Sequence, residues 1–154
     1  MTKTRWLDDR QQHLWRSYLR MNQELYALLG ALHMSESGMS VSDYAVLVPL
    51  SEAPGGLARA RDLGRELGWD RSRLSHHLAR MERRGLIVRE DCEEDARGLM
   101  VRLTPVGRRA IEAAAPAHAE AVQRYFFDLL SSEEVDTLTA VFDRVIDKLP
   151  RDAG

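Results

Sequence analysis

Hydrophobic residues recur every three, four or seven positions along much of the chain, which is the spacing of amphipathic helices. The first such stretch runs from about Leu7 to Met34 and predicts one long helix. Ser40, with Asp43 three residues later, resembles a capping box and predicts a second helix from Val41 to about Ser51. The chain therefore begins with a long helix and a shorter one.

Two short helical segments follow a break at residues 52–56, where proline and glycine gather. The first runs from Ala58 to Leu67 and stops at Gly68. The second begins after Asp70, a good N-cap, and ends at Gly85. Two short helices joined by a tight turn that contains glycine form the helix-turn-helix pattern.

The pattern then changes to two short runs that are typical of β-strands. Leu86–Arg89 and Leu99–Leu103 flank a polar loop, Asp91–Gly98, and together they predict a hairpin, or wing.

Two more helices complete the chain. Thr104 followed by Pro105 is an N-cap with proline at the first helical position, and it predicts a helix to about Leu130. Ser131 with Glu134 forms another capping box, which predicts a final helix. The predicted fold is mainly α with a small β-hairpin wing.

Charge is distributed unevenly over the 154 residues. The net charge of −2 argues by itself against a general nucleic-acid binder. Residues 1–58 carry 5 basic and 6 acidic side chains (−1), residues 59–109 carry 13 and 9 (+4), and residues 110–154 carry 4 and 9 (−5). The basic residues of the middle third are all arginine, whose planar guanidinium suits phosphate and guanine.

Composition excludes several classes of protein. Hydrophobic residues make up 44% and charged residues 30%, so the chain can bury a core. It lacks an apolar run of the roughly 18 residues that a membrane span needs, and the apolar core of a secretory signal is missing at its start, so we expect a cytoplasmic protein. The single cysteine, Cys92, cannot form an internal disulfide.

The segment 70–84 carries the main functional signal. On a helical wheel, Leu74, Leu78 and Met81 mark a buried face, and the opposite face is small, polar and basic. Small side chains allow close approach to the major groove, while Arg and His reach acceptors on guanine. We predict these major-groove residues: Ser72, Arg73, Ser75, His76, Arg80 and Arg83. The alternative is a charged face that is merely solvated.

Several short motifs resemble one family. They are Leu63-Gly64-Arg65-Glu66-Leu67, Leu74-Ser75, Glu82-Arg83-Arg84-Gly85-Leu86-Ile87, Asp95-Ala96-Arg97 and Leu103-Thr104-Pro105-Val106-Gly107-Arg108. With this succession, over nearly the whole chain, the sequence resembles the multiple antibiotic resistance regulator (MarR) family. The resemblance implies an obligate homodimer whose first and last two helices interlock, with wings along the adjacent minor groove. The expected division is 1–38 and 110–154 for a helical dimerisation scaffold and 39–109 for the winged helix-turn-helix region, in one intertwined domain.

The resemblance also implies that Arg97 enters the minor groove and that Asp95 holds it in position. A narrow minor groove attracts arginine, and Gly98 allows a tight turn at the hairpin tip. The same loop is crowded with acidic residues that should repel phosphates. The alternative is that Arg97 only neutralises this acidic loop.

Aromatic residues suggest a place for an effector. Members of this family bind small aromatic acids in crevices between the dimer scaffold and the reading unit, and such ligands loosen DNA binding. The candidate lining residues are Trp15, Tyr18, Tyr26 and Trp69. The alternative is that these side chains are core or dimer contacts.

Other chemistry finds little support. The five histidines lack the spacing of a helical zinc pair, and His76 and His77 point about 100° apart, so no metal or cofactor is expected. We expect His77 to be a structural histidine. Cys92 lies near the hairpin, whereas thiol sensors of the family usually place their cysteine near the first helix. Motifs of a phosphate loop or a nucleophile elbow are missing from the sequence, so we do not expect an enzyme.

The sequence therefore predicts a sequence-specific, double-stranded DNA-binding transcriptional regulator. We expect a homodimeric repressor on a pseudo-palindromic site, with one major-groove helix per subunit about 34 Å apart, released by a small aromatic ligand. The alternative is a winged-helix module that binds other proteins and not DNA.

Overall fold

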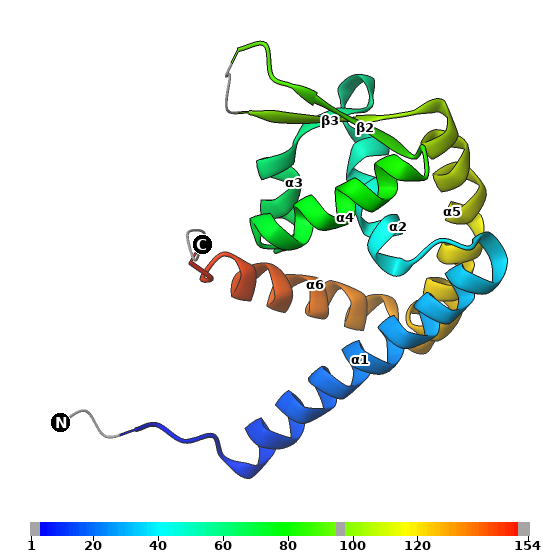
Figure 1. Ribbon diagram of the computed structural model, residues 1–154. Helices are drawn as coiled ribbons and strands as arrows, with labels where there is room; N and C mark the ends of the chain where they lie inside the picture. The colour runs from blue at the N-terminus through cyan, green and yellow to red at the C-terminus, as the bar shows by residue number, and fades with distance from the viewer. Residues whose placement is uncertain (1–3, 95–97, 151–154) are drawn as a thin grey trace.

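The computed structural model describes residues 4–94 and 98–150 and shows a mainly helical chain with one small sheet (Figure 1). The helices are α1 (Asp9–Ser37), α2 (Val41–Glu52), α3 (Ala60–Leu67), α4 (Arg71–Arg83), α5 (Pro105–Tyr125) and α6 (Ser132–Ile146). The strands are β1 (Leu57–Arg59), β2 (Ile87–Asp91) and β3 (Leu99–Leu103). Short 3-10 turns lie at Pro54–Gly56 and Phe127–Leu129.

Local capping fixes where most helices begin. The capping boxes predicted before α2 and α6 are confirmed, because Ser40 pairs with Asp43 and Ser131 with Glu134. Thr104 accepts a hydrogen bond from the amide of Gly107 at the start of α5. Helix α1 begins slightly later than expected, at Asp9, because Asp8 forms a capping box of its own. Helix α5 ends earlier than expected, at Tyr125, and a 3-10 turn follows it.

The sheet contains one strand that the sequence pattern did not predict. Its strand order is β1-β3-β2, and both pairs are antiparallel. The hairpin of β2 and β3 was expected, although β2 runs to Asp91, two residues beyond the predicted end. Residues 58–59 were assigned to a helix but lie in β1, because Ala58 pairs with Val101 and Arg59 with Met100 of β3. A three-residue strand is too short to show an alternating pattern.

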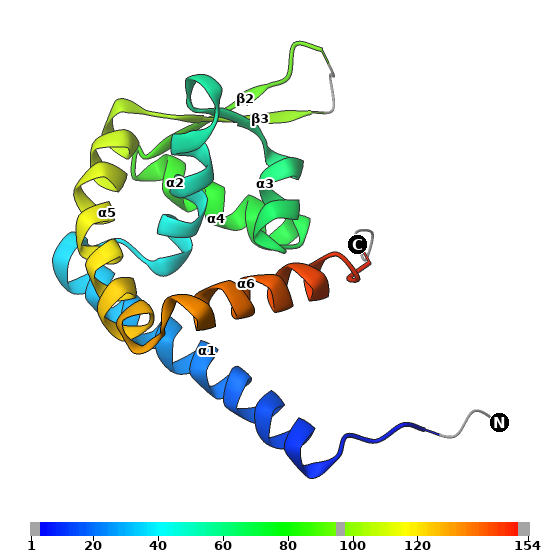
Figure 2. The same cartoon turned by 180° about the vertical axis from the view of Figure 1, so that it is seen from behind.

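One hydrophobic core holds the helix-turn-helix to the sheet. Helix α2 contributes Val46, Leu47 and Leu50, and these side chains are completely buried. The predicted inner face of α4 is confirmed, since Leu74, Leu78 and Met81 are buried in the same cluster. In both views α3 and α4 lie on one side of the sheet, and the hairpin extends beyond them (Figures 1 and 2).

A cluster of three rings joins the long helices to the core unit. His33 of α1, Tyr44 of α2 and His118 of α5 lie with ring centroids 4.3 to 5.1 Å apart. Nε2 of His33 lies 3.0 Å from Nδ1 of His118, which is hydrogen-bond distance. Burial lowers the pKa of His33, and both burial and the nearby His33 lower the pKa of His118. Both imidazoles are therefore held in the neutral form.

The outer parts of α1 and α6 lie away from the core. Both figures show the N-terminal half of α1 extending from the rest of the molecule, and no residue of α6 is buried. These two helices expose large apolar side chains, among them Leu14, Trp15, Leu19, Phe142, Val145 and Ile146. Within the described ranges, none of the helices is long and apolar enough to cross a membrane.

Candidate nucleic-acid interface

The turn between α3 and α4 sets the orientation of α4. Gly68 ends α3 in the left-handed conformation (φ 64°), which glycine adopts without strain. Asp70 then caps α4, and its carboxylate accepts a hydrogen bond from the amide of Arg73 (2.9 Å). Gly64 lets the two helices approach closely, because a Cβ there would lie 3.3 Å from Cδ2 of Leu74. The predicted helix-turn-helix is confirmed.

The outer face of α4 is polar and accessible. All six residues predicted for the major groove are exposed on this helix: Ser72, Arg73, Ser75, His76, Arg80 and Arg83. The residues between them that face inward are Leu74, His77, Leu78 and Met81. The structure therefore brings the six side chains to one exposed surface, which we call the α4 face.

Trp69 supports one arginine of the α4 face. The guanidinium carbon of Arg73 lies 4.2 Å from the ring centroid of Trp69, in cation–π geometry. The ring of Trp69 also meets that of His77 nearly at a right angle, with centroids 5.4 Å apart. Trp69 packs against the hydrophobic core. Its contacts thus hold the first turn of α4 in place.

The structure does not bring the four aromatic residues of the expected crevice together. Trp15, Tyr18 and Tyr26 lie on α1 and are 54%, 40% and 60% exposed, respectively. The rings of Trp15 and Tyr18 stack on each other, with centroids 5.7 Å apart. Trp69 lies at the α3–α4 turn instead, away from the exposed half of α1 (Figure 1).

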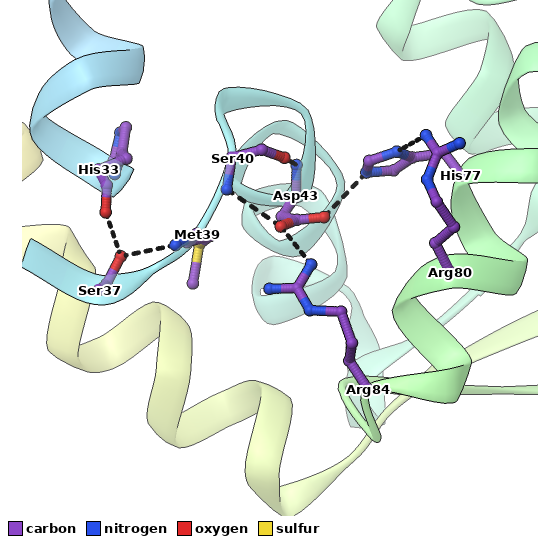
Figure 3. A network of polar contacts seen from close by, with 8 residues as sticks. All are labelled: His33, Ser37, Met39, Ser40, Asp43, His77, Arg80 and Arg84. Atoms are coloured by element: carbon purple, nitrogen blue, oxygen red, sulfur yellow. Dashed lines mark hydrogen bonds and ion pairs between the residues drawn. The ribbon is translucent and has the colours of Figure 1, made fainter. Parts of the chain in front are cut away.

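A polar network connects α2 to α4 beneath the α4 face (Figure 3). Asp43 of α2 is only 2% exposed, and its Oδ2 accepts a hydrogen bond from Nη1 of Arg84 (2.6 Å). Its Oδ1 lies 3.0 Å from Nε2 of His77, which is 6% exposed. Nδ1 of His77 in turn pairs with Nη2 of Arg80 (2.9 Å). We call Asp43, His77, Arg80 and Arg84 the α2–α4 network.

The carboxylate of Asp43 stays ionised inside this network. Burial alone would raise the pKa of Asp43, because it removes water from the charged form. The contacts with His77 and Arg84, together with the hydrogen bond from the amide of Ser40, hold this pKa well below its usual range. Asp43 is thus a fixed negative charge under α4.

Sequence reasoning found only part of this network. Asp43 was expected to cap α2, which it does, and His77 was expected to be structural, which its burial confirms. The ion pairs of Asp43 with α4 were missed, because 41 residues separate Asp43 from Arg84. A pattern within one helix cannot show such a pairing.

Opposite charges pair along the wing. Arg102 of β3 holds Glu90 of β2 through two guanidinium nitrogens, with a shortest distance of 2.6 Å. Arg59 of β1 lies 3.4 Å from Glu94. Glu90 of β2 and Glu94 of the acidic loop therefore each have a cationic neighbour. The predicted minor-groove residues, Asp95 and Arg97, lie outside the described residues.

The described residues do not form a candidate metal site. Among residues 4–94 and 98–150, no group of three His, Cys, Asp or Glu side chains could hold a metal ion. Cys92 is a free thiol of intermediate exposure.

Comparisons with known proteins agree with one another. The model of a family described as the MarR family matches residues 37–98. AbsC, a MarR family transcriptional regulator from Streptomyces coelicolor, is 38% identical, with 94% of this chain and 97% of that chain covered and a TM-score of 0.87. A comparison with curated proteins finds no match.

Two further solved structures carry bound molecules. Sco3205, a MarR family transcriptional regulator from Streptomyces coelicolor solved in complex with DNA, is 35% identical, with a TM-score of 0.91 and coverage of 96% of this chain and 92% of that one. The PcaV transcriptional regulator from the same organism, solved with its natural ligand, is 28% identical, with a TM-score of 0.74 and coverage of 94% and 99%.

Proposed function

The chain belongs to the MarR family of DNA-binding transcriptional regulators, and we propose that it is a homodimeric repressor that reads a pseudo-palindromic duplex site with α4. The relatives it matches are transcription regulators and not enzymes. One observation carries the proposal: the polar, basic α4 face is exposed while the opposite side of the same helix is buried. A cytoplasmic location is part of the same proposal, and membership of a family of DNA-binding regulators is consistent with it.

The composition of the α4 face supports major-groove reading. Ser72, Ser75 and His76 are short enough to let the helix approach the base edges, and Arg73 lies in the first turn of α4. The N-terminal residues of a recognition helix commonly contact bases in the major groove. Arginine can bond O6 and N7 of guanine with two nitrogens at once. We assign Arg73 and His76 to bases and Ser75 to the backbone.

Apolar surface on the terminal helices supports the homodimer. Leu14 and Leu19 of α1 and Phe142 and Ile146 of α6 are exposed in a single chain. Soluble monomers rarely expose large contiguous apolar patches, so we infer that another protein surface buries these side chains of α1 and α6. Residues 110–154 carry a net charge of −5, which is unsuited to contact with DNA. A second copy of the chain covers such a surface and supplies the second α4.

The wing and the effector remain parts of the same proposal. We assign Arg97 to the minor groove and Asp95 to its positioning, and the paired charges of β2 and β3 support an ordered hairpin base. PcaV, a similar protein, is solved with its natural ligand, which supports an effector for this chain, and we propose that this effector is a small aromatic molecule. Since Trp15, Tyr18 and Tyr26 lie apart from Trp69 in one chain, a crevice lined by all four needs a contribution from the second copy.

Selection of duplexes from a random pool tests the proposal. We expect the wild-type protein to enrich a two-fold symmetric motif, and we expect its affinity to fall steeply between about 50 and 200 mM salt as counterions are released. His76→Ala is expected to lose preference at one base pair of each half-site. Replacement of exposed Val106 at the start of α5 by Ala serves as the matched control, since this position lies outside the α4 face and outside the terminal helices α1 and α6. Absence of enrichment, with binding that is insensitive to salt, would contradict DNA binding and favour a protein-binding module.

A further inference from the structure

One arginine of the α4 face, Arg80, contacts a buried side chain on the inner side of the helix. Arg80 is exposed, yet its Nη2 lies 2.9 Å from Nδ1 of the buried His77. Arg83 is its neighbour on the same face. Within residues 4–94 and 98–150, no hydrogen bond or ion pair holds the side chain of Arg83. The two arginines therefore differ in how far their positions are fixed before DNA arrives.

The partner of Arg80 defines which nitrogen of His77 carries the proton. A guanidinium has only donors, so Nδ1 of His77 must accept the hydrogen bond. The proton of the neutral ring then lies on Nε2, which faces Oδ1 of Asp43 at 3.0 Å. This contact is short but imperfectly aligned, since Nε2 has no well-directed acceptor among the described residues. It therefore acts mainly as an attraction between the N–H dipole and the carboxylate charge.

Asp43 is anchored independently of His77. Its Oδ2 accepts from the amide of Ser40 (3.0 Å) and from Nη1 of Arg84 (2.6 Å). Both the carboxylate and the imidazole are more than nine-tenths buried. The chain of contacts thus runs from the fixed start of α2, through the interior, to the guanidinium of Arg80 (Figure 3).

We propose that Asp43 and His77 are positioning residues, which hold the guanidinium of Arg80 where it contacts DNA. This inference rests on the proposed function. Four of the five guanidinium donors stay available when one is engaged by His77. A side chain that is already ordered loses less conformational freedom on binding, so the contact between Arg80 and DNA becomes stronger. Neither Asp43 nor His77 touches DNA in this account.

The proton position in His77 is the first test, and it needs no DNA. In the wild-type protein, the 15N chemical shifts of the ring should show Nε2 protonated and Nδ1 unprotonated. Asp43→Asn removes the carboxylate charge, so we expect the proton to move partly or fully to Nδ1. A wild-type ring with its proton on Nδ1 would overturn the proposal, because Arg80 could not donate to it.

A double-mutant cycle is the second test. The probe is a duplex that the wild-type protein itself selects from a random pool. We expect Asp43→Asn to weaken binding about two- to tenfold, which corresponds to the usual cost of ordering one long side chain. In the Arg80→Ala background the same change should have almost no effect. In the Arg83→Ala background, the matched control, it should keep its full effect.

The outcomes separate positioning from a general structural role. If Asp43→Asn weakens binding equally with and without Arg80, the network only stabilises the fold and the proposal is wrong. Should this variant not fold, His77→Ala interrupts the same connection and leaves the Asp43–Arg84 pair in place, and the same cycle applies. A wild-type protein that selects no sequence contradicts the proposed function itself, and the positioning role with it. Additivity in a protein that does select sequences contradicts the positioning role alone.

Discussion

Gly107 lies against the backbone of Leu86 so closely that a Cβ at this position would sit 2.1 Å from the carbonyl oxygen of Leu86. The amide of Gly107 donates to Oγ1 of Thr104 (3.0 Å), and that hydroxyl donates to the carbonyl of Gly85 (2.6 Å). The start of α5 is thereby fixed to the chain that connects α4 with the wing. This close contact positions the helix-turn-helix relative to the long helix behind it.

The first prediction concerns this contact. Gly107→Ala should lower the free energy of unfolding by about 3 kcal/mol, the upper end of the usual cost of overpacking, because the closest clash is with the backbone of Leu86, which cannot rotate away as a side chain can. Denaturant unfolding monitored by circular dichroism measures it. Val106→Ala, at the exposed neighbouring position, should change stability by no more than about 0.5 kcal/mol. Equal stability of the Gly107→Ala variant and the wild type would show that the backbone relaxes at this point.

The second prediction concerns the cation–π contact between Trp69 and Arg73. Trp69→Leu should weaken DNA binding by about 0.5–1 kcal/mol, because Arg73 loses the ring that holds its guanidinium. Trp69→Phe keeps an aromatic ring and should lose less. Binding titrations with a selected duplex, together with melting curves of each variant, measure both effects. If Trp69→Leu and Trp69→Phe bind equally well, the ring does not support Arg73 in the complex.

The third prediction is a dependence of stability on pH. The pKa values of His33 and His118 are lowered in the folded chain by burial, and that of His118 also by the neighbouring imidazole. The unfolded chain therefore binds protons first as pH falls below about 6.5, so stability is lost from there down through the folded pKa values. We expect the free energy of unfolding to fall by roughly 1 kcal/mol per pH unit in this window.

Denaturant unfolding at pH 7.5, 6.5 and 5.5 measures this loss. His118→Gln should make the curve flatter, because it removes one of the two histidines whose pKa is lowered in the folded chain. His76→Gln, at an exposed position on α4 outside the terminal helices, serves as the control for replacing a surface histidine. A wild-type stability that is constant over this range would contradict the assignment of neutral imidazoles.

The sequence predicted those parts of the fold that depend on near neighbours. The capping boxes at Ser40 and Ser131 each need only residues three positions apart, and both are present. The buried stripe of α4 follows from the spacing of Leu74, Leu78 and Met81 along one helix. Strand β1 was missed because its identity as a strand depends on pairing with residues 100–102, more than forty positions away.

The same limit applies to the site. The exposed residues of α4 could be assigned from helical periodicity, and every one of them is accessible. The α2–α4 network beneath them could not be predicted in this way, because Asp43 contacts Arg84 and His77 only through the tertiary packing of α2 on α4. A capping residue that also carries a buried charge looks the same in sequence as one that does not.

The fourth prediction separates the wing from α4. Arg97→Ala should weaken binding to specific and non-specific duplexes alike, since a minor-groove arginine mainly meets backbone charge and groove shape. Arg73→Ala or His76→Ala should cost on the order of 1–3 kcal/mol at particular base pairs only. Affinities for a library of single-base variants of the selected site measure the difference. If all three variants lose affinity uniformly across the library, the division between base reading and backbone contact is wrong.

The most direct test of major-groove reading by two copies of α4 is methylation interference on the selected duplex. A methyl group on N7 of guanine lies in the major groove and blocks a side chain that approaches there. We expect interference at two clusters related by two-fold symmetry and separated by about one helical turn, roughly 10 base pairs. Interference at a single cluster, or tight binding that N7 methylation leaves unchanged, would contradict the account.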